Sequence, residues 1–470
     1  MNQQAIREHA RWWAPVLGVA AGWLADLGGM PRDASITLGI AIVTAVWWML
    51  EAVPIPAASL VPITLLPLFG VLSAKTAVAQ SYGHPLILLL LGGFFLSKGM
   101  ERSGVHRRLA LGMVRLCGGG GGRSLLLGFM LAASVLSMWI SNTATTLMLL
   151  PIAMAVLEAG KKTDGVNPMA APLMLGIAYA ASLGGLGSPI GTPPNLVFIE
   201  QYAVFTGTVM TFGQWMAFGL PVVVIMVPLT WLWLARHQRK ADAVELPETG
   251  PWRPAEIRTL IVFGLTALAW MTRAEPFGGW SEWLGLPGAN DASVAFVGTL
   301  MMFLIPDGTG RPGAEGRLLD WDTAKEVPWG ILILFAGGIC LAEGIRESGL
   351  SEIAAGSLKN LSNLPPLLLV AVVCLVMTFL TELTSNTAST ILMMPILGSA
   401  AVANGLDPKL LMLPAALSAS CAFMLPVATA PNAVIFGTGH LTVQRMVREG
   451  LVLNLIGAVV IALYCWLMSR

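Results

Sequence analysis

The sequence predicts an all-α polytopic membrane protein with about eleven transmembrane helices and two re-entrant hairpins, arranged as an inverted repeat. Three observations predict this fold class. Of the 470 residues, 56% are hydrophobic and 11% are charged, whereas soluble domains carry about 25% charged residues. The apolar runs approach the roughly 20 residues that a helix needs to cross a bilayer. Two of these runs contain the same polar tripeptide, Ser-Asn-Thr.

The first quarter of the chain predicts four spans and a surface helix. Arg7 and Arg11 precede the first apolar run, and no small-residue cleavage site follows, so we interpret this run as an uncleaved span. Residues 98–123 are rich in Arg and are therefore expected to be cytoplasmic. The four spans are expected at 12–29, 34–50, 53–72 and 84–100. An amphipathic surface helix within 98–123 is predicted by Val105, Leu109, Met113 and Leu116, which recur among the arginines at roughly helical spacing.

Each tripeptide is expected at the tip of a hairpin that enters and leaves the membrane on one side. The first hairpin, 124–157, has Ser-Asn-Thr at 141–143 and a basic loop on either side, so both of its ends are expected in the cytoplasm. Two full spans would need about 40 apolar residues, more than the segment 124–157 contains. The second hairpin, 365–403, has Ser-Asn-Thr at 385–387. Polar groups at this depth are costly unless they line a cavity or bind something.

Two further spans are predicted to be broken. Residues 168–200 contain GGLGSPIGTPPN, and residues 409–440 contain MLPVATAPNAVIFGTG. The prolines in these segments remove backbone donors and clash with the preceding turn. Each break leaves helix ends and free backbone groups facing whatever binds there.

The remaining spans complete a topology with a cytoplasmic N-terminus and an external C-terminus. They are expected at 213–235, 258–275, 291–306, 328–345 and 449–468. In this topology most of the 27 Lys and Arg residues are cytoplasmic, as the positive-inside rule requires. The cations expected outside are Arg32, Lys75, Arg273, Arg346, Lys359, Lys409 and Arg470.

The two halves of the chain also match in residues. LGGFFLSKGMERSG (91–104) matches AGGICLAEGIRESG (336–349), and GTPPNLVF (191–198) matches ATAPNAVI (428–435). An odd number of spans separates equivalent elements, so the halves are expected to have opposite orientations. Inverted repeats with broken helices place a binding site near the bilayer midplane, where the repeats meet.

Two Ser-Asn-Thr hairpins, each paired with a T-x-P-N segment, form a specific combination. In these motifs the chain resembles the divalent anion sodium symporter family, the carriers of dicarboxylates, citrate and related carboxylates. The resemblance covers nearly the whole chain and includes EAVPIPAASLVPITLLPLFGV at 51–71. It implies a secondary active transporter of the bacterial inner membrane that imports C4-dicarboxylates, such as succinate, malate and fumarate, together with Na⁺.

The resemblance further implies an elevator mechanism and a homodimer embedded in lipid, with no nucleic-acid partner. The scaffold would comprise residues 1–123 and 246–360. The mobile transport domain would comprise residues 124–245 and 361–470, which contain both hairpins and both broken spans.

Site residues are assigned by matching the family's motifs. Substrate carboxylates would contact Ser141, Asn142, Thr143, Thr192, Pro193, Ser385, Asn386, Thr387, Thr429 and Ala430. One Na⁺ would be bound by Ser137, Ser141, Asn142 and the carbonyl of Gly191, and a second by Thr381, Thr384, Asn386 and the carbonyl of Ala428. Ala430 is a departure, because Pro is expected there in many relatives, and it leaves substrate specificity on that side open.

The chemistry of the motifs is consistent with this family. A dicarboxylate brings two negative charges into a site of low dielectric constant, and neither motif contains an Arg or Lys to meet them. Hydroxyls, Asn amides and backbone N–H groups can contact the carboxylates, while carbonyl and side-chain oxygens suit a small hard cation. Co-bound Na⁺ would neutralise the substrate.

Other interpretations stay open at the level of sequence. Na⁺-independent exchange of dicarboxylates, or a citrate or sulfate substrate, would use the same motifs. A conductive anion channel would also have polar re-entrant loops. An intramembrane enzyme is the least favoured interpretation, because the predicted spans contain no HExxH, GxSxG or paired-Asp signature. Glu51 and Glu382 are interpreted as structural hydrogen-bonding groups, with proton coupling as the alternative.

Overall fold

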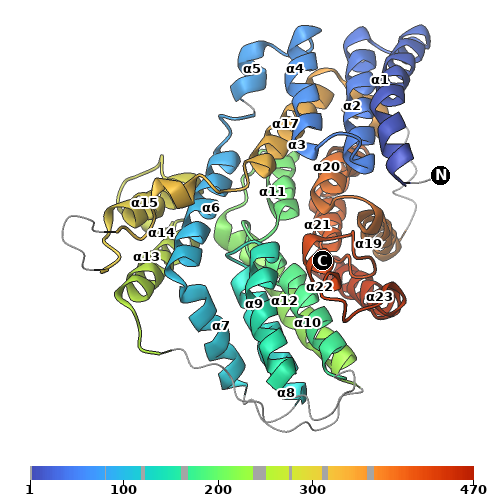
Figure 1. Cartoon of the computed structure of the whole chain (residues 1–470). Helices are drawn as coiled ribbons and strands as arrows, with labels where there is room; N and C mark the ends of the chain where they lie inside the picture. The colour runs from blue at the N-terminus through green and yellow to red at the C-terminus, as the bar shows by residue number, and fades with distance from the viewer. Residues whose placement is uncertain are drawn as a thin grey trace.

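The computed structural model is built of α-helices (Figure 1). It describes residues 3–79, 81–117, 122–159, 168–236, 250–274, 278–309, 316–356 and 365–469. Lys359 and Arg470, two of the cations expected outside, lie beyond these ranges. Within the described ranges the backbone forms no β-strand, only an isolated bridge between Pro306 and Arg317. The all-α prediction is confirmed.

The N-terminal spans are helical, with one difference from the sequence prediction. The span expected at 53–72 consists of two short helices, α3 (Ile55–Ala58) and α4 (Leu60–Leu68). Pro62 cannot donate a hydrogen bond to the carbonyl of Ala58, so the ladder is interrupted there. The Trp48 indole donates to Ser59 Oγ at 2.9 Å and fixes this break. The neighbouring helices are α1 (Gln3–Leu27), α2 (Arg32–Leu50), α5 (Ala74–Ala79) and α6 (Pro85–Ser103).

The surface helix expected after the fourth span is α7 (Val105–Leu116). It packs on α8 (Gly122–Ser137). Its buried face is formed by Val105, Ala110, Leu111 and Val114. Leu116, expected on the apolar face, is 88% exposed, because Val114 and Cys117 form the face of this last turn that lies against Gly128 of α8.

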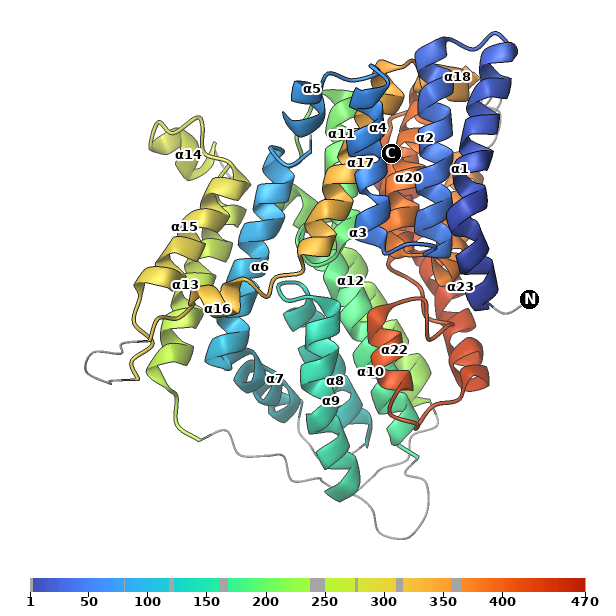
Figure 2. The same ribbon diagram turned by 45° about the horizontal axis from the view of Figure 1, so that its top comes forward.

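Both segments predicted as hairpins form pairs of helices joined by a short turn, and their re-entry on one side of the membrane stays a prediction. The first consists of α8 and α9 (Asn142–Ala159), and the second of α19 (Pro366–Leu383) and α20 (Asn386–Ala403). In each, the Asn of the tripeptide is the first helical residue after the turn. The α8–α9 hairpin occupies the lower half of Figures 1 and 2, and α20 the upper half.

The two broken spans are also confirmed. The first consists of α10 (Ala170–Gly184), a 3₁₀ turn (Gly185–Gly187) and α11 (Pro193–Thr206). The second consists of α21 (Lys409–Ala419) and α22 (Ala430–Phe436). In both, the second helix begins within T-x-P-N, with a proline in its first turn, where no N–H is needed.

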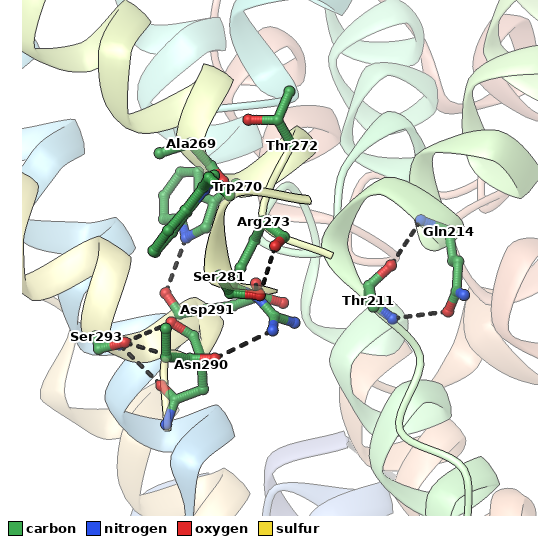
Figure 3. Close-up of polar contacts among 12 residues, drawn as sticks. Thr211, Gln214, Ala269, Trp270, Thr272, Arg273, Ser281, Asn290, Asp291 and Ser293 are labelled. Atoms are coloured by element: carbon green, nitrogen blue, oxygen red, sulfur yellow. Dashed lines mark hydrogen bonds and ion pairs between the residues drawn. The ribbon is translucent and has the colours of Figure 1, made fainter. Parts of the chain in front are cut away.

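Five further helices follow the expected spans, namely α12 (Phe212–Ala235), α13 (Pro254–Met271), α15 (Asp291–Leu304), α17 (Trp329–Glu347) and α23 (Val443–Met468). Three short helices form in segments expected to be loops, namely α14 (Gly279–Trp283), α16 (Trp321–Ala324) and α18 (Leu350–Gly356). Figure 3 shows how the turn after α13 is tied to α15. Arg273 Nε lies 2.5 Å from Asp291 Oδ1, and the Trp270 indole donates to the carbonyl of Asp291 at 2.8 Å.

Eight of the described helices are long and apolar enough to cross a membrane, fewer than the eleven spans expected. Two of the eight are α19 and α20, the arms of the second hairpin. Part of the difference arises where a span is split or short, as in α3–α4 and in α15, which has 14 residues. The other part arises in α1 and α6, which are long enough but contain too many charged and polar residues. The chain is therefore a multi-pass membrane protein, and the number of crossings stays a prediction.

Packing divides the helices into two groups. In the first group α1–α6 pack among themselves and with α13, α15, α16 and α17, and in the second α8–α12 pack with α19–α23. Contacts between the groups are fewer and include α7 on α8 and α18 on α20. These two short helices follow the matching segments 91–104 and 336–349, so they are equivalent elements of the repeat.

Candidate functional site

The tips of the two hairpins face one cavity of about 530 Å³. The loops of the two broken spans form its other polar walls. All ten residues expected to contact substrate line it, namely Ser141, Asn142, Thr143, Thr192, Pro193, Ser385, Asn386, Thr387, Thr429 and Ala430. Among the further cation candidates, Gly191, Thr384 and Ala428 line the cavity, whereas Ser137 and Thr381 are buried behind the tips.

The first tip is built by the end of α8 and the start of α9. Ser141 caps α9, because its Oγ accepts the backbone N–H of Ala144 at 3.2 Å. This cap fixes the next residue, Asn142, at the first helical position. The side chain of Asn142 then points at Ser137, whose Oγ lies 2.5 Å from the carboxamide.

The carboxamide of Asn142 lies in a cluster of oxygen atoms. The same terminal atom is 2.5 Å from Ser137 Oγ, 3.2 Å from the carbonyl of Gly191 and 3.3 Å from the carbonyl of Ala181. As an NH₂ group it would donate to all three. As an oxygen it would form, with these three, a group of four oxygens, a donor set that suits a hard cation.

Sequence reasoning missed two members of this cluster. The carbonyl of Ala181 belongs to a continuous apolar helix, so no motif marks it. Gly185 is the other: a Cβ at this position would lie 2.9 Å from Asn142 Oδ1 and 3.1 Å from the carbonyl of Gly191. A glycine is therefore needed for Asn142 to approach the broken span.

The second tip is arranged differently. Thr384 lines the cavity and donates to the carbonyl of Leu380 at 2.8 Å, and Thr381 donates to the carbonyl of Thr378 at 3.0 Å. Asn386 Oδ1 is buried and has no hydrogen-bond partner within the described part of the chain. A buried amide oxygen without a donor is destabilising, and a bound cation would satisfy it.

The asparagines of the two T-x-P-N segments hold the broken spans in shape. Asn195 Nδ2 donates to the carbonyls of Gly185 at 2.8 Å and Ser188 at 2.7 Å. Asn432 Nδ2 makes the equivalent bonds, to Ala422 at 3.1 Å and Leu425 at 3.0 Å. The repeated motif thus has a repeated structural role, and it positions the carbonyls of Gly191 and Ala428.

Glu382 ties the second hairpin to the second broken span. Its carboxylate accepts the backbone N–H groups of Met424 at 2.9 Å and Leu425 at 3.0 Å, and the side-chain amide of Asn454 at 2.7 Å. These bonds support the interpretation of Glu382 as a structural hydrogen-bonding group. Met138 occupies the equivalent position in the first hairpin, where a bond from Ser188 to its carbonyl replaces them.

Glu51 lies at the rim of the cavity with Arg7, which sequence reasoning did not assign to the site. Arg7 Nη2 lies 3.0 Å from Glu51 Oε2, and both side chains are about half exposed. Arg7 is the one Lys or Arg among the described residues that line the cavity. Because Glu51 pairs with it, the cavity gains no net positive charge from side chains.

Three comparisons with known proteins identify the family. A family model described as the sodium:sulfate symporter transmembrane region matches residues 11–469. The chain is 39% identical over 452 residues to the sodium-dependent dicarboxylate transporter SdcS of Staphylococcus aureus, in strain bovine RF122 / ET3-1 and in strain USA300, covering 92% of this chain and 86% of the relative.

Among solved structures, the YdaH transporter of Alcanivorax borkumensis aligns with a TM-score of 0.57 and 15% identity, covering 91% of this chain and 98% of that protein. This likeness concerns the fold alone. The family match spans almost the entire chain and includes both hairpins and both broken spans. The chain belongs to the sodium:sulfate symporters, the divalent anion sodium symporter family, and is a membrane transporter and not an enzyme.

Proposed function

We propose that this protein imports C4-dicarboxylates such as succinate, malate and fumarate, coupled to Na⁺. The observation that carries the proposal is the cavity in which both Ser-Asn-Thr tips converge without a net positive side-chain charge. A dianion at this position needs cations that arrive with it. The curated relatives at 39% identity are named sodium-dependent dicarboxylate transporters.

Two cation sites are proposed beside the substrate. The first uses Ser137, Ser141, Asn142 and the carbonyl of Gly191, and the oxygen cluster around Asn142 supports it. The second uses Thr381, Thr384, Asn386 and the carbonyl of Ala428, and the unpartnered oxygen of Asn386 supports it. Both share a tripeptide Asn with the substrate cavity, so cation and carboxylate would be neighbours at each tip.

The size of the cavity fits a small dianion. Ligand sites typically measure about 300–1,000 Å³, and this cavity measures about 530 Å³. One carboxylate would contact Ser141 and Thr143, and the other Ser385 and Thr387. A cavity of this volume also has room for citrate or sulfate, so competition with succinate uptake is needed to rank these anions.

We further propose an elevator mechanism in a homodimer. The two packing groups correspond to the proposed scaffold, 1–123 and 246–360, and to the proposed transport domain, 124–245 and 361–470. The cavity lies between them, since it is lined by α2, α6 and α17 on one side and by the hairpins and broken spans on the other. Sliding of one group past the other would expose the cavity to each side of the membrane in turn.

The test is uptake of radiolabelled succinate into proteoliposomes, with an inward gradient of Na⁺, K⁺ or choline. We expect uptake with Na⁺ alone, stimulated by an inside-negative potential if more than two Na⁺ accompany each dianion. Equal uptake in choline would overturn Na⁺ coupling. Counterflow from succinate-loaded vesicles without any cation gradient would then identify an exchanger, and competition by citrate or sulfate ranks the substrates.

A further inference from the structure

A buried contact between a histidine and a carboxylate lies outside the cavity and is not used by the proposed transport site. Glu200 on α11 places Oε2 3.1 Å from Nε2 of His84, the residue that caps α6. The side chains are 11% and 18% exposed. Among the described residues, His84 is the one that forms an ion-pair contact with Glu200.

The hydrogen bonds fix the proton on the imidazole. Nδ1 of His84 accepts the backbone N–H of Leu86 at 3.3 Å, as an N-cap does. The neutral ring therefore carries its proton on Nε2, the nitrogen that lies 3.1 Å from Glu200 Oε2. Protonating Nδ1 would remove the cap of α6, so an additional proton binds more readily to the carboxylate of Glu200.

The surroundings of Glu200 offer it no second cation. Phe335, Gly338 and Ile339 of α17 and Ile391 of α20 surround it. The other titratable group that acts on it is Glu343 of α17, which is itself paired with Arg346 at 2.8 Å. α20 contains no titratable residue, and Lys409 at the start of α21 lies over the Phe218 ring.

The pair joins the two packing groups. α6 belongs to the first group, and α11 packs on α20 and α21 in the second. The second half of the chain builds the same elements without such a pair. Extending the matches of 91–104 with 336–349 and of 191–198 with 428–435 places Trp329 opposite His84 and Gly437 opposite Glu200. The fold itself does not require the pair.

We propose that Glu200 is a proton-binding site that latches the two helix groups together. With Glu200 charged, the attraction between its carboxylate and the Nε2–H of His84, 3.1 Å apart, would hold α11 in its present position against α6. When a proton from solvent binds to the carboxylate, a neutral contact replaces this charge-assisted one and the latch loosens. Release of that proton after α11 returns restores the charged bond, so the movement proposed for transport becomes dependent on pH.

The size of the effect follows from the two kinds of bond. Hydrogen bonds to charged groups contribute more than neutral ones by about a factor of two. We therefore expect loosening by about five- to tenfold in the opening equilibrium. The proposal rests on the proposed movement of two groups, and the experiment separates its failure from a failure of the proposed substrate.

The first measurement is hydrogen–deuterium exchange of the purified protein without substrate, at pH 7.5 and 5.5, corrected for the intrinsic pH dependence of exchange. In the wild type, amides of α11 should exchange about five- to tenfold faster at pH 5.5. Glu200→Gln mimics the protonated acid, so the amides of α11 in this variant should exchange fast at both pH values. His84→Asn keeps an N-cap but loses the imidazole N–H that faces Glu200, so its α11 amides should also exchange fast at both pH values.

The matched control is Glu449→Gln. Glu449 pairs with Arg236 at 2.6 Å and is similarly buried, but both residues belong to the second group. This variant should keep the pH dependence of the wild type. Unchanged α11 exchange in the wild type, or persistence of its pH dependence in Glu200→Gln, would overturn the latch.

The second measurement is succinate counterflow at equal Na⁺ on both sides, over the same pH range. The wild-type rate should change with pH and that of Glu200→Gln should not. If the wild type does not carry succinate at all, the proposed function fails, while the exchange measurement still decides the latch.

Discussion

At the scale of single residues, the proposed function depends most on Asn142 and Asn386. Each lies at a hairpin tip, lines the cavity and belongs to a proposed cation site. Replacing either with Ala removes an oxygen that no neighbour can supply, so Na⁺-dependent succinate uptake should fall to background in both variants. In Asn386→Ala, expression and the melting temperature without ligand should stay close to wild type, because Asn386 Oδ1 has no partner to lose among the described residues. Asn142→Ala also loses the contact with Ser137 and should melt slightly lower.

The control is Asn404→Ala, which removes an amide at the end of α20, away from the cavity. It should transport normally. Retained Na⁺-dependent uptake in both tip variants would show that the site assignment is wrong.

Gly185 gives a second prediction at this scale. In Gly185→Ala the new methyl group would lie 2.9 Å from Asn142 Oδ1, closer than such contacts allow, so Asn142 must shift within the oxygen cluster. Overpacking of this kind costs about 1–3 kcal/mol. The Na⁺ concentration for half-maximal uptake should rise about tenfold. Ala422 occupies the equivalent position in the second half, and Ala422→Gly should leave Na⁺ affinity nearly unchanged.

At the scale of elements, α16 shows how a short helix is held on α6. Asp320 caps α16 by accepting the N–H of Thr323 at 2.9 Å, and it pairs with Arg102 of α6. Burial alone would raise the pKa of Asp320, but the bonds from Thr323 and the charge of Arg102 outweigh it and lower the pKa. The charged form of Asp320 therefore stabilises the folded protein fully above the pKa of an unfolded Asp, about 4. This stabilisation is lost as pH falls through the lower pKa that Asp320 has in the folded protein.

Asp320→Asn tests this contribution, because Asn keeps the cap and loses the charge. The melting temperature at pH 7 should fall by about 1–2 °C, since the pair is partly exposed. The difference from wild type should shrink as pH approaches 4 and below. Asp322→Asn in the same helix is the control and should have no effect, as Asp322 is 87% exposed. A pH-independent loss in Asp320→Asn would contradict the electrostatic explanation.

The elements differ in how well the sequence predicts them. The hairpins and broken spans were predictable because prolines, glycines and polar islands mark them locally. The 14-residue α15 was not, because a span is recognised by its apolar length, which tertiary packing can replace. The split between α3 and α4 is marked by Pro62, but the apolar length of 53–72 favoured one continuous span. Ala181, Gly185 and Arg7 could not be found at all, since their roles depend on contacts between segments distant in the chain.

At the scale of the whole molecule, the proposed mechanism requires the two groups to move as units while the cavity between them holds a charged ligand. A dianion bound alone would have to be carried through the membrane with two uncompensated charges, which is costly. With Na⁺ bound at both tips, as proposed, the charges would be neutralised before the groups move. This requirement couples the two binding events, whichever way the groups slide.

Coupled binding is measurable without transport, by the melting temperature of the purified protein in Na⁺, K⁺ or choline, each with and without succinate. A ligand that binds only the folded state stabilises it by RT ln(1 + [L]/Kd). Na⁺ alone should raise the melting temperature, because it satisfies the oxygens around Asn142 and Asn386. Succinate should raise the melting temperature further in Na⁺ and have no effect in K⁺ or choline, since the cavity supplies no net positive charge without Na⁺.

By reciprocity, succinate should lower the Na⁺ concentration at which half of the Na⁺ stabilisation is reached. An equal succinate shift in choline would show that the protein itself neutralises the dianion, with Arg7 as the first residue to substitute.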